Sequence, residues 1–408
     1  MRRVRILAPC LALLVHAFVA QAAPDEELLG KSAGYPVGTR TTWFFGEHVR
    51  VGSFSHLDEI FPHSTLKKSN APSPLPKAAD APPIGYLFEG RYYSLDDFLA
   101  HQRVTGFLLI RNGEVVAERY QYDRTAQNRF VSHSMAKSIV GLAVGIALAE
   151  KKIASLDDIA AKYVPELAGT AYGETTIRNL LRMSSGVAFR EVYDGKDDIS
   201  QLVRVRAVYD SIMALRGFNT REVEQGTRFH YASSETVALT VLLRAVTGMT
   251  LSEYLTPRLW QPMGAEADAS WIRTADGTED GMGAFNATLR DYGRLGVLLA
   301  NDGAVGERQV VPKDFLLEAT DWKRQPGAFK PGIATSYFGY GYQFWLFPSE
   351  RRRFALLGVY GQSVFVDPGL KLVMVITGAA RNASVGRESF ARERDALWRG
   401  IVAQYGNW

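Results

Sequence analysis

Strand signals lie near the two ends of this chain, and the residues between them read mainly as helices and loops. Near the front, Asn112-Gly113 separates two apolar runs at 105–110 and 115–120, and this dipeptide is the strongest short hairpin signal. Near the end, further runs with strand character cover residues 340–346, 354–357, 363–366 and 372–376. The simplest assembly is one antiparallel sheet built from both ends, flanked by helices, with an inserted helical lobe. The sequence therefore predicts an α/β (α+β) fold.

The same pattern predicts the domain boundaries. An irregular N-terminal extension covers residues 23–100 and contains a proline-rich, extended surface segment. The main domain covers residues 101–400, with a sheet lobe from 101–155 and 280–408 and a helical lobe from 156–279.

Three residues give local helix signals inside the predicted helical lobe. Thr176 and Ser234 are candidate N-caps, and Gly248 is a candidate helix stop. A final helix is expected at 389–404.

The first 22 residues resemble a secretory signal peptide. A basic head precedes an apolar run at 6–20, and Ala20-Gln21-Ala22 is a small-x-small cleavage signature. Cleavage removes three arginines and no acidic residue, so the formal charge falls from +4 to +1. This balance does not favour nucleic acid as a partner. We expect a secreted, periplasmic protein with no stable membrane span after cleavage.

Cysteine and histidine usage argues against metal and redox chemistry. Cys10 is the one cysteine and lies in the predicted leader, so the mature chain has no disulfide and no thiolate. The six remaining histidines show no metal-ligand spacing, and we take His133 as structural. The sequence predicts no metal, nucleotide or redox cofactor.

Ser134 and Lys137 open the most apolar helix of the predicted mature chain. Residues i and i+3 share one helix face, so the amine can reach the hydroxyl. A serine alcohol needs a neighbouring base, and burial can lower the pKa of a lysine enough to supply one. A helix start also offers free N–H groups to a developing oxyanion. The alternative is a helix-start serine beside a surface charge.

Two decoys show why spacing alone is weak. Ser64 and Lys67 share the three-residue spacing, but the sequence that follows is too rich in proline for a helix. Gly30-Lys31-Ser32-Ala33-Gly34 fits a nucleophile elbow, but no strand precedes it and Tyr35-Pro36 prevents a helix after it.

Three motifs in order resemble the serine β-lactamase and penicillin-binding peptidase superfamily, on its class C-like branch. They are Ser134-x-x-Lys137, Tyr231-Ala232-Ser233 about a hundred residues later, and a glycine-bearing strand ending at Gly358-Val359. Within this branch the chain is most similar to 6-aminohexanoate-oligomer hydrolases and esterase-like members, over roughly residues 100–400. The resemblance implies a β-lactamase/transpeptidase-like fold.

The resemblance also implies roles for the motif residues. Ser134 is the acylated nucleophile, Lys137 helps to deprotonate it, and Tyr231 shuttles the proton to the leaving group. The backbone N–H groups of Ser134 and Val359 form the oxyanion hole. The residues predicted to bind substrate are Ser233, Trp345, Gly358, Tyr360 and Gln362.

Two departures from the family pattern bear on the substrate. Ser233 stands where class C enzymes usually have asparagine. Leu356-Leu357 precedes Gly358 where a Lys-Thr or His-Thr pair usually meets a substrate carboxylate. A site without that partner should reject a charged carboxylate.

We therefore predict a serine hydrolase that acts through an acyl-enzyme on small neutral esters or amides. The alternatives are a D-alanyl-D-alanine peptidase or weak β-lactamase, and a non-catalytic homologue that binds cell-wall ligands. The oligomeric state stays open.

Overall fold

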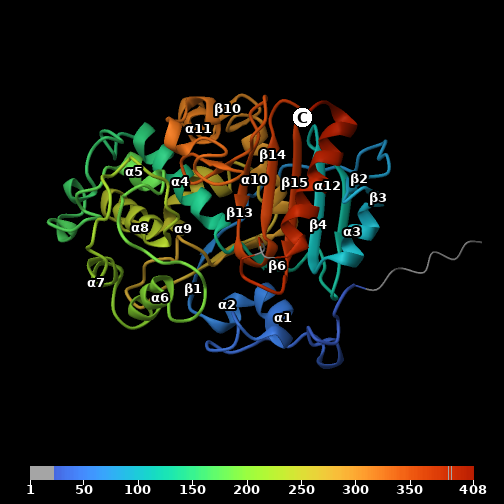
Figure 1. Ribbon diagram of the computed structural model, residues 1–408, viewed down its shortest axis with the longest axis horizontal. Coiled ribbons are helices and arrows are strands. Elements are labelled where there is room, and N and C mark those ends of the chain that lie inside the picture. The colour runs from blue at the N-terminus through green and yellow to red at the C-terminus, as the bar shows by residue number, and fades with distance from the viewer. Residues whose placement is uncertain (1–22, 385, 387) are drawn as a thin grey trace, which may run out of the picture.

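A seven-stranded antiparallel sheet forms the centre of the computed structural model, which describes residues 23–384, 386 and 388–408 (Figure 1). The predicted signal peptide and Cys10 lie outside these residues. The strand order is β11-β12-β13-β14-β15-β4-β5, so strands from the two ends of the chain meet where β15 pairs with β4. The predicted sheet is confirmed. Its strands are β4 (Val104–Arg111), β5 (Glu114–Tyr120), β11 (Gly339–Tyr340), β12 (Trp345–Leu346), β13 (Phe354–Leu357), β14 (Ser363–Asp367) and β15 (Leu372–Gly378).

The Asn112-Gly113 turn has the predicted hairpin geometry. Both residues have positive φ, 52° and 83°, which a two-residue type I′ turn requires. The prediction for 340–346 is wrong in part, because two short strands stand there instead of one. Gln343 lies between them with φ 66° and donates its backbone N–H to Leu181 O at 2.9 Å, so the chain leaves the sheet to bind the helical lobe.

Helices cover both faces of the sheet. Leu108 and Ile110 of β4 share a core with α10 (Leu289–Ala300), whereas Phe107 and Leu109 share one with α12 (Ser389–Tyr405). This alternation follows from the two-residue period of a strand. Figure 1 shows α12 in red against the sheet, and the predicted final helix is confirmed.

The helical lobe packs beside the sheet around α4, which is buried along nearly its whole length. Thr176 caps α5 as predicted, since its hydroxyl accepts the Asn179 N–H. Gly248, with φ 67°, ends α8 as predicted. Ser234 is not an N-cap, because α8 begins one residue earlier and the Ser234 hydroxyl pairs with the Tyr172 phenol. The lobe contains α4 (Met135–Ala149), α5 (Ile177–Leu181), α6 (Asp198–Val208), α7 (Ser211–Arg216), α8 (Ser233–Thr247) and α9 (Leu251–Leu255), followed by a π-helical turn (Thr256–Trp260).

A second, four-stranded sheet has the order β1-β7-β8-β6 and ties the N-terminal region to the main domain. Ser64 lies in β1 opposite Trp271, and Lys67 pairs with Asp268, so this serine–lysine decoy is not helical. The prediction that residues 23–100 are irregular is wrong in part, because backbone pairing with distant β7 creates a strand that local sequence does not reveal. The elements here are α1 (Arg50–Ser55), α2 (Leu57–Ile60), β1 (His63–Leu66), β2 (Gly85–Phe88), β3 (Arg91–Ser94), α3 (Leu95–His101), β6 (Arg129–Val131), β7 (Ala269–Ile272) and β8 (Phe285–Thr288).

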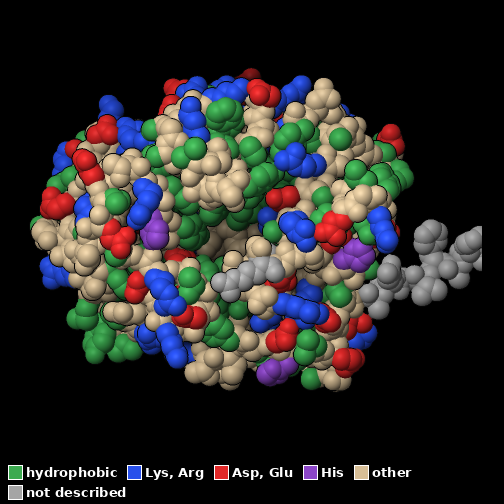
Figure 2. All heavy atoms as spheres, viewed as in Figure 1, with side chains coloured by type: hydrophobic (Ala, Val, Ile, Leu, Met, Phe, Trp, Pro, Cys, Tyr) green, Lys and Arg blue, Asp and Glu red, His purple; other side chains and the backbone are tan. Residues whose placement is uncertain are grey.

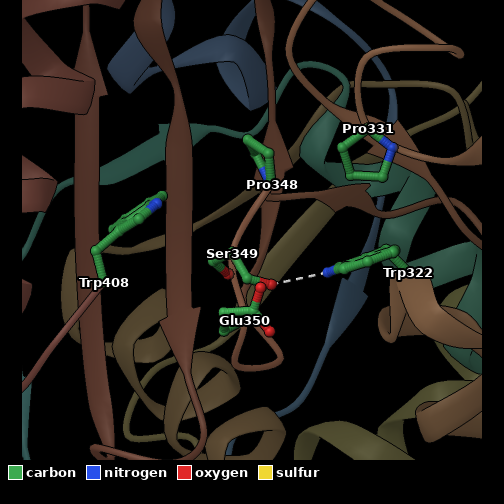
Figure 3. Close-up of a pocket in the computed structure, with 6 residues that line it drawn as sticks. All are labelled: Trp322, Pro331, Pro348, Ser349, Glu350 and Trp408. Atoms are coloured by element: carbon green, nitrogen blue, oxygen red, sulfur yellow. Dashed lines mark hydrogen bonds between the residues drawn. The ribbon is translucent and has the colours of Figure 1, made fainter.

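The remaining elements lie around the rim. A small hairpin and one helix precede the last strands, and a surface cavity of about 360 Å³ opens between Trp322 and Trp408 (Figure 3). None of the predicted site residues lines this cavity. Within the described residues, no helix has the length and apolar character needed to cross a membrane. The rim elements are β9 (Ala304–Val305), β10 (Arg308–Gln309), α11 (Lys313–Thr320) and 3-10 turns at Lys31–Ala33, Glu47–Val49, Ala160–Lys162, Pro165–Leu167, Trp322–Arg324, Gly327–Phe329 and Val359–Gly361.

A buried ion pair in the seven-stranded sheet also holds the C-terminal end of the chain. Arg353 and Asp367 are both fully buried and pair through Nε and Oδ2, and Arg353 Nη2 also donates to Asn407 O at 2.6 Å. We expect Arg353→Met to lower the free energy of unfolding by about 3–5 kcal/mol, because it leaves the Asp367 charge buried and unpaired. Chemical denaturation measures this change. Exposed Arg351→Met is the control, and equal stability of the two variants would contradict the prediction.

Candidate active site

Ser134 stands at the N-cap of α4, where the chain passes from β6 into the helix. His133 makes this turn possible by adopting φ 43°. His133 and Met135, the neighbours of Ser134, are buried, whereas Ser134 itself is partly exposed. Figure 2 shows a hollow near the middle of one face, between the helical lobe and the sheet. The nucleophile predicted from sequence therefore stands at a helix start and remains accessible.

Lys137 is buried and touches Ser134. Its Nζ donates to Ser134 Oγ at 2.9 Å and to the carbonyl of Met282 at 2.7 Å. Desolvation lowers the pKa of Lys137 to about 8, although the negative charges of Glu191 and Asp280 oppose this shift. A substantial fraction of the amine is therefore neutral near physiological pH, as a base must be.

Tyr231 approaches the same hydroxyl from the loop before α8. Its ring lies 5.2 Å from Lys137 Nζ. Desolvation raises the pKa of Tyr231, the Glu191 charge raises it further, and a hydrogen bond with Ser134 opposes them. A nearby cation such as Lys137 would by itself make this phenol easier to deprotonate. Burial dominates instead, so the phenol stays protonated and is suited to donate or relay a proton.

The end of β13 lies against the segment that precedes Ser134. A Cβ added to Gly358 would lie 2.4 Å from the carbonyl oxygen of Ser132, so only glycine permits this approach. Among the described residues, the N–H groups of Ser134 and Val359 have no protein acceptor. Two free donors at the end of a strand and the start of a helix fit an oxyanion hole.

Tyr193 and Glu191 belong to the site, although sequence analysis did not single them out. The phenol of Tyr193 donates to Glu191 Oε1 at 2.6 Å. Burial raises the pKa of Tyr193, and the nearby Ser134 hydroxyl opposes this rise. Tyr193 has φ 61°, and Phe44 packs against its ring. A loop tyrosine between two helices carries no motif, so the sequence offers no signal for it.

Ser233 is engaged inside the protein. Its N–H and its hydroxyl both donate to Glu191 at 2.8 Å, and its side chain is buried. Ser233 therefore holds Glu191, and through it Tyr193, in place. The Ser233 hydroxyl already donates its proton to Glu191, so this proton is not available for the predicted contact with substrate.

The other predicted substrate-binding residues divide into two groups. Trp345 is partly exposed and stacks on Tyr231 with ring centroids 5.5 Å apart, and Gly358 stands beside Ser132. Tyr360 and Gln362 are buried. The Gln362 side chain bonds Gly378 through both of its polar atoms, so it joins β14 to β15.

The two leucines before Gly358 point to opposite faces of β13. Leu356 is fully buried in the core on the α4 side, and Leu357 is partly exposed. Neither supplies a charge or a hydroxyl. Among the described residues, no group of three His, Cys, Asp or Glu side chains is placed to hold a metal ion.

The profile of the beta-lactamase family matches residues 95–396 of the chain. The chain belongs to this family. The match covers both lobes, so the resemblance noted in the sequence and the β-lactamase/transpeptidase-like fold are confirmed.

Named relatives include hydrolases of several kinds. The chain is 26% identical over 357 residues to a 6-aminohexanoate-dimer hydrolase of Paenarthrobacter ureafaciens, covering 85% of this chain and 88% of that protein. A Bacillus anthracis structure, provisionally described as a 6-aminohexanoate-dimer hydrolase, superposes with TM-score 0.79 at 24% identity, covering 88% and 95% of the two chains. A family VIII carboxylesterase superposes with TM-score 0.58 at 19% identity, covering 75% and 96%.

The contact at Gly358 generates a prediction. In Gly358→Ala the new methyl group would push β13 away from Ser132 and move the Val359 N–H, so kcat/KM for an ester should fall at least about a hundredfold. Circular dichroism should show that the variant still folds. Gly327→Ala is the control, since its Cβ would meet no atom within 4 Å. Unchanged turnover by Gly358→Ala would contradict the proposed oxyanion geometry.

Proposed function

We propose that this chain is a secreted serine hydrolase that forms an acyl-enzyme on Ser134 and acts on neutral esters or amides. One observation carries the proposal: the amine of buried Lys137 lies 2.9 Å from the Ser134 hydroxyl, with its pKa lowered to about 8. Export rests on the leader signals at residues 1–22.

In the first step Ser134 Oγ attacks the substrate carbonyl carbon and its proton passes to Lys137 Nζ. The carbonyl oxygen becomes an oxyanion, which the N–H groups of Ser134 and Val359 stabilise. The tetrahedral intermediate then collapses, and the bond from carbon to the leaving oxygen or nitrogen breaks.

Tyr231 is the proton donor to the leaving group. Its ring lies 5.2 Å from Lys137 Nζ, and burial keeps its phenol protonated, so it can give its proton to the leaving atom and regain one from the ammonium. Water then attacks the acyl carbon and gives a proton to the same relay. The bond from this carbon to Ser134 Oγ breaks, Oγ takes the proton back, and the acid is released.

The charges beside the nucleophile favour a substrate that is neutral at the reacting group. Glu191 and Asp280 both act on Lys137 electrostatically, and Asp280 pairs with buried Arg206. Leu357 replaces the hydroxyl that usually meets a substrate carboxylate. A carboxylate placed here would meet a leucine side chain instead of that hydroxyl and would add to the negative charge of Glu191 that acts on Lys137. The Paenarthrobacter relative is named for a 6-aminohexanoate dimer. Two amino acids of this kind joined through amine and carboxyl group form an amide, which supports an amide as one substrate class.

Covalent labelling tests the proposal. A fluorophosphonate should add to Ser134, and peptide mass spectrometry should find the adduct on this residue. Ser134→Ala should abolish both labelling and ester turnover, whereas Ser64→Ala, the decoy in β1, should retain both. Absence of an adduct on Ser134 would overturn the proposed function. Rapid acylation by a fluorescent penicillin would instead favour the peptidase or β-lactamase alternative, and saturable ligand binding without turnover a non-catalytic homologue.

The pKa of Lys137 predicts the pH dependence of acylation. The base acts as a neutral amine, so kcat/KM should rise about tenfold per pH unit below pH 8 and level off above it. Initial rates with a nitrophenyl ester, corrected for spontaneous hydrolysis, measure this profile. A profile that is flat or falling as pH rises from about 6 to about 8 would exclude Lys137 as the base.

A further inference from the structure

An N-terminal segment lies beside the nucleophile, although about 80 residues of sequence separate them. We call residues 39–61 the N-terminal arm; it contains α1 and α2, which Figure 1 shows below the central sheet. Phe54 of the arm lies 4.7 Å from the ring of His133, and Trp43 stacks on that ring at 6.1 Å. His133 immediately precedes Ser134. The arm therefore packs on the turn that presents the nucleophile.

The arm also holds the residue that follows the oxyanion donor. Tyr360 has φ 60° and directly follows Val359. Its phenol donates to Phe44 O at 3.0 Å, and the guanidinium of Arg50 lies 4.4 Å from its ring. Arg50 is buried and also donates to Ala380 O at 2.8 Å. The position of Val359 thus depends on contacts that the arm supplies.

Phe44 is the arm residue that reaches all three parts of the site. Its ring centroid lies 5.8 Å from His133, 5.2 Å from Tyr360 and 6.2 Å from Tyr193. These residues come from the start of α4, the end of β13 and the loop before α6. The Phe44 side chain is partly exposed, so it is not simply a core residue.

The Phe44 ring thus contacts residues of the helical lobe and of the sheet lobe, and one of them, His133, directly precedes Ser134. We infer that Phe44 is a specificity-determining residue: it forms the end wall of the substrate cleft and limits the size of the substrate group that lies between Tyr193 and Tyr360. The inference rests on the proposed function and deepens it. It assigns a part of the hydrolase site to a segment that precedes residue 95, where the family match begins.

Two ester series test the inference on the full mature chain. One varies acyl length with a nitrophenol leaving group, and the other varies the leaving alcohol with an acetyl group. In Phe44→Ala, kcat/KM for larger members should rise relative to the smallest member of one series, by roughly fourfold for each methylene newly buried. Phe44→Leu removes less of the wall and should give a smaller change in the same series.

Phe61→Ala is the matched control. Phe61 is an arm aromatic that packs on Trp43 at 5.8 Å, and among the described residues its ring makes no aromatic contact with Tyr193, Tyr360 or His133. This variant should keep the selectivity of the parent in both series, even if its melting temperature falls as much as that of Phe44→Ala. A role of Phe44 in stability alone would not produce a difference between the two variants.

The outcomes separate this inference from the proposed function. If Phe44→Ala and Phe44→Leu are labelled by fluorophosphonate but keep the parent's selectivity in both series within about twofold, the inference is overturned and the hydrolase proposal stands. If the parent chain itself takes no label on Ser134, the proposed function fails first. A change in selectivity in one ester series that Phe61→Ala does not show supports Phe44 as the end wall of the cleft.

Discussion

The burial of Lys137 beside Ser134 is the constraint on which the site depends. An ammonium in a dry environment is costly, so desolvation lowers its pKa and populates the neutral amine. The lysine is buried because α4 is apolar around nearly its whole circumference and packs between other helices of its lobe and β13 of the sheet. Its head group meets two oxygens, Ser134 Oγ and Met282 O, which satisfy it. The fold thereby turns an ordinary side chain into a candidate base.

Three segments must reach this pair at once: the end of β13, the loop with Tyr193 and the loop before α8. The first two depend on local backbone constraints. Gly358 has no side chain, which lets β13 approach Ser132. Tyr193 and Tyr360 adopt left-handed φ values that aim their rings toward the site or the arm. Ser233 donates to Glu191, which accepts from the Tyr193 phenol, and these hydrogen bonds fix the position of that phenol. Stacking on Trp345 supports the ring of Tyr231. Strained conformations of this kind persist only where the surroundings enforce them.

The charge distribution distinguishes this site from one that binds carboxylates. Glu191 and Asp280 face the nucleophile's lysine, and Arg206 is occupied by Asp280. Side chains alternate between the two faces of β13, so Leu356 is fully buried in the core and Leu357 is partly exposed on the other face. These features support the proposed function on a neutral ester or amide, in which packing around Ser134 rather than an ion pair would set the selectivity.

Features with local causes could be predicted from the sequence. The Asn112-Gly113 turn, the Thr176 cap and the spacing of Ser134 and Lys137 depend on residues a few positions apart, and the motif order pointed to Tyr231 and Val359. Contacts between distant segments were decided only by the tertiary structure. Glu191 and Tyr193 join the site through a loop conformation that has no sequence signature, and Gln362 bonds a neighbouring strand instead of facing the cleft. The arm reaches His133, the residue before Ser134, because strand β1 and aromatic packing bring residues 39–66 against the domain. Such long-range contacts leave no periodic pattern in a single sequence.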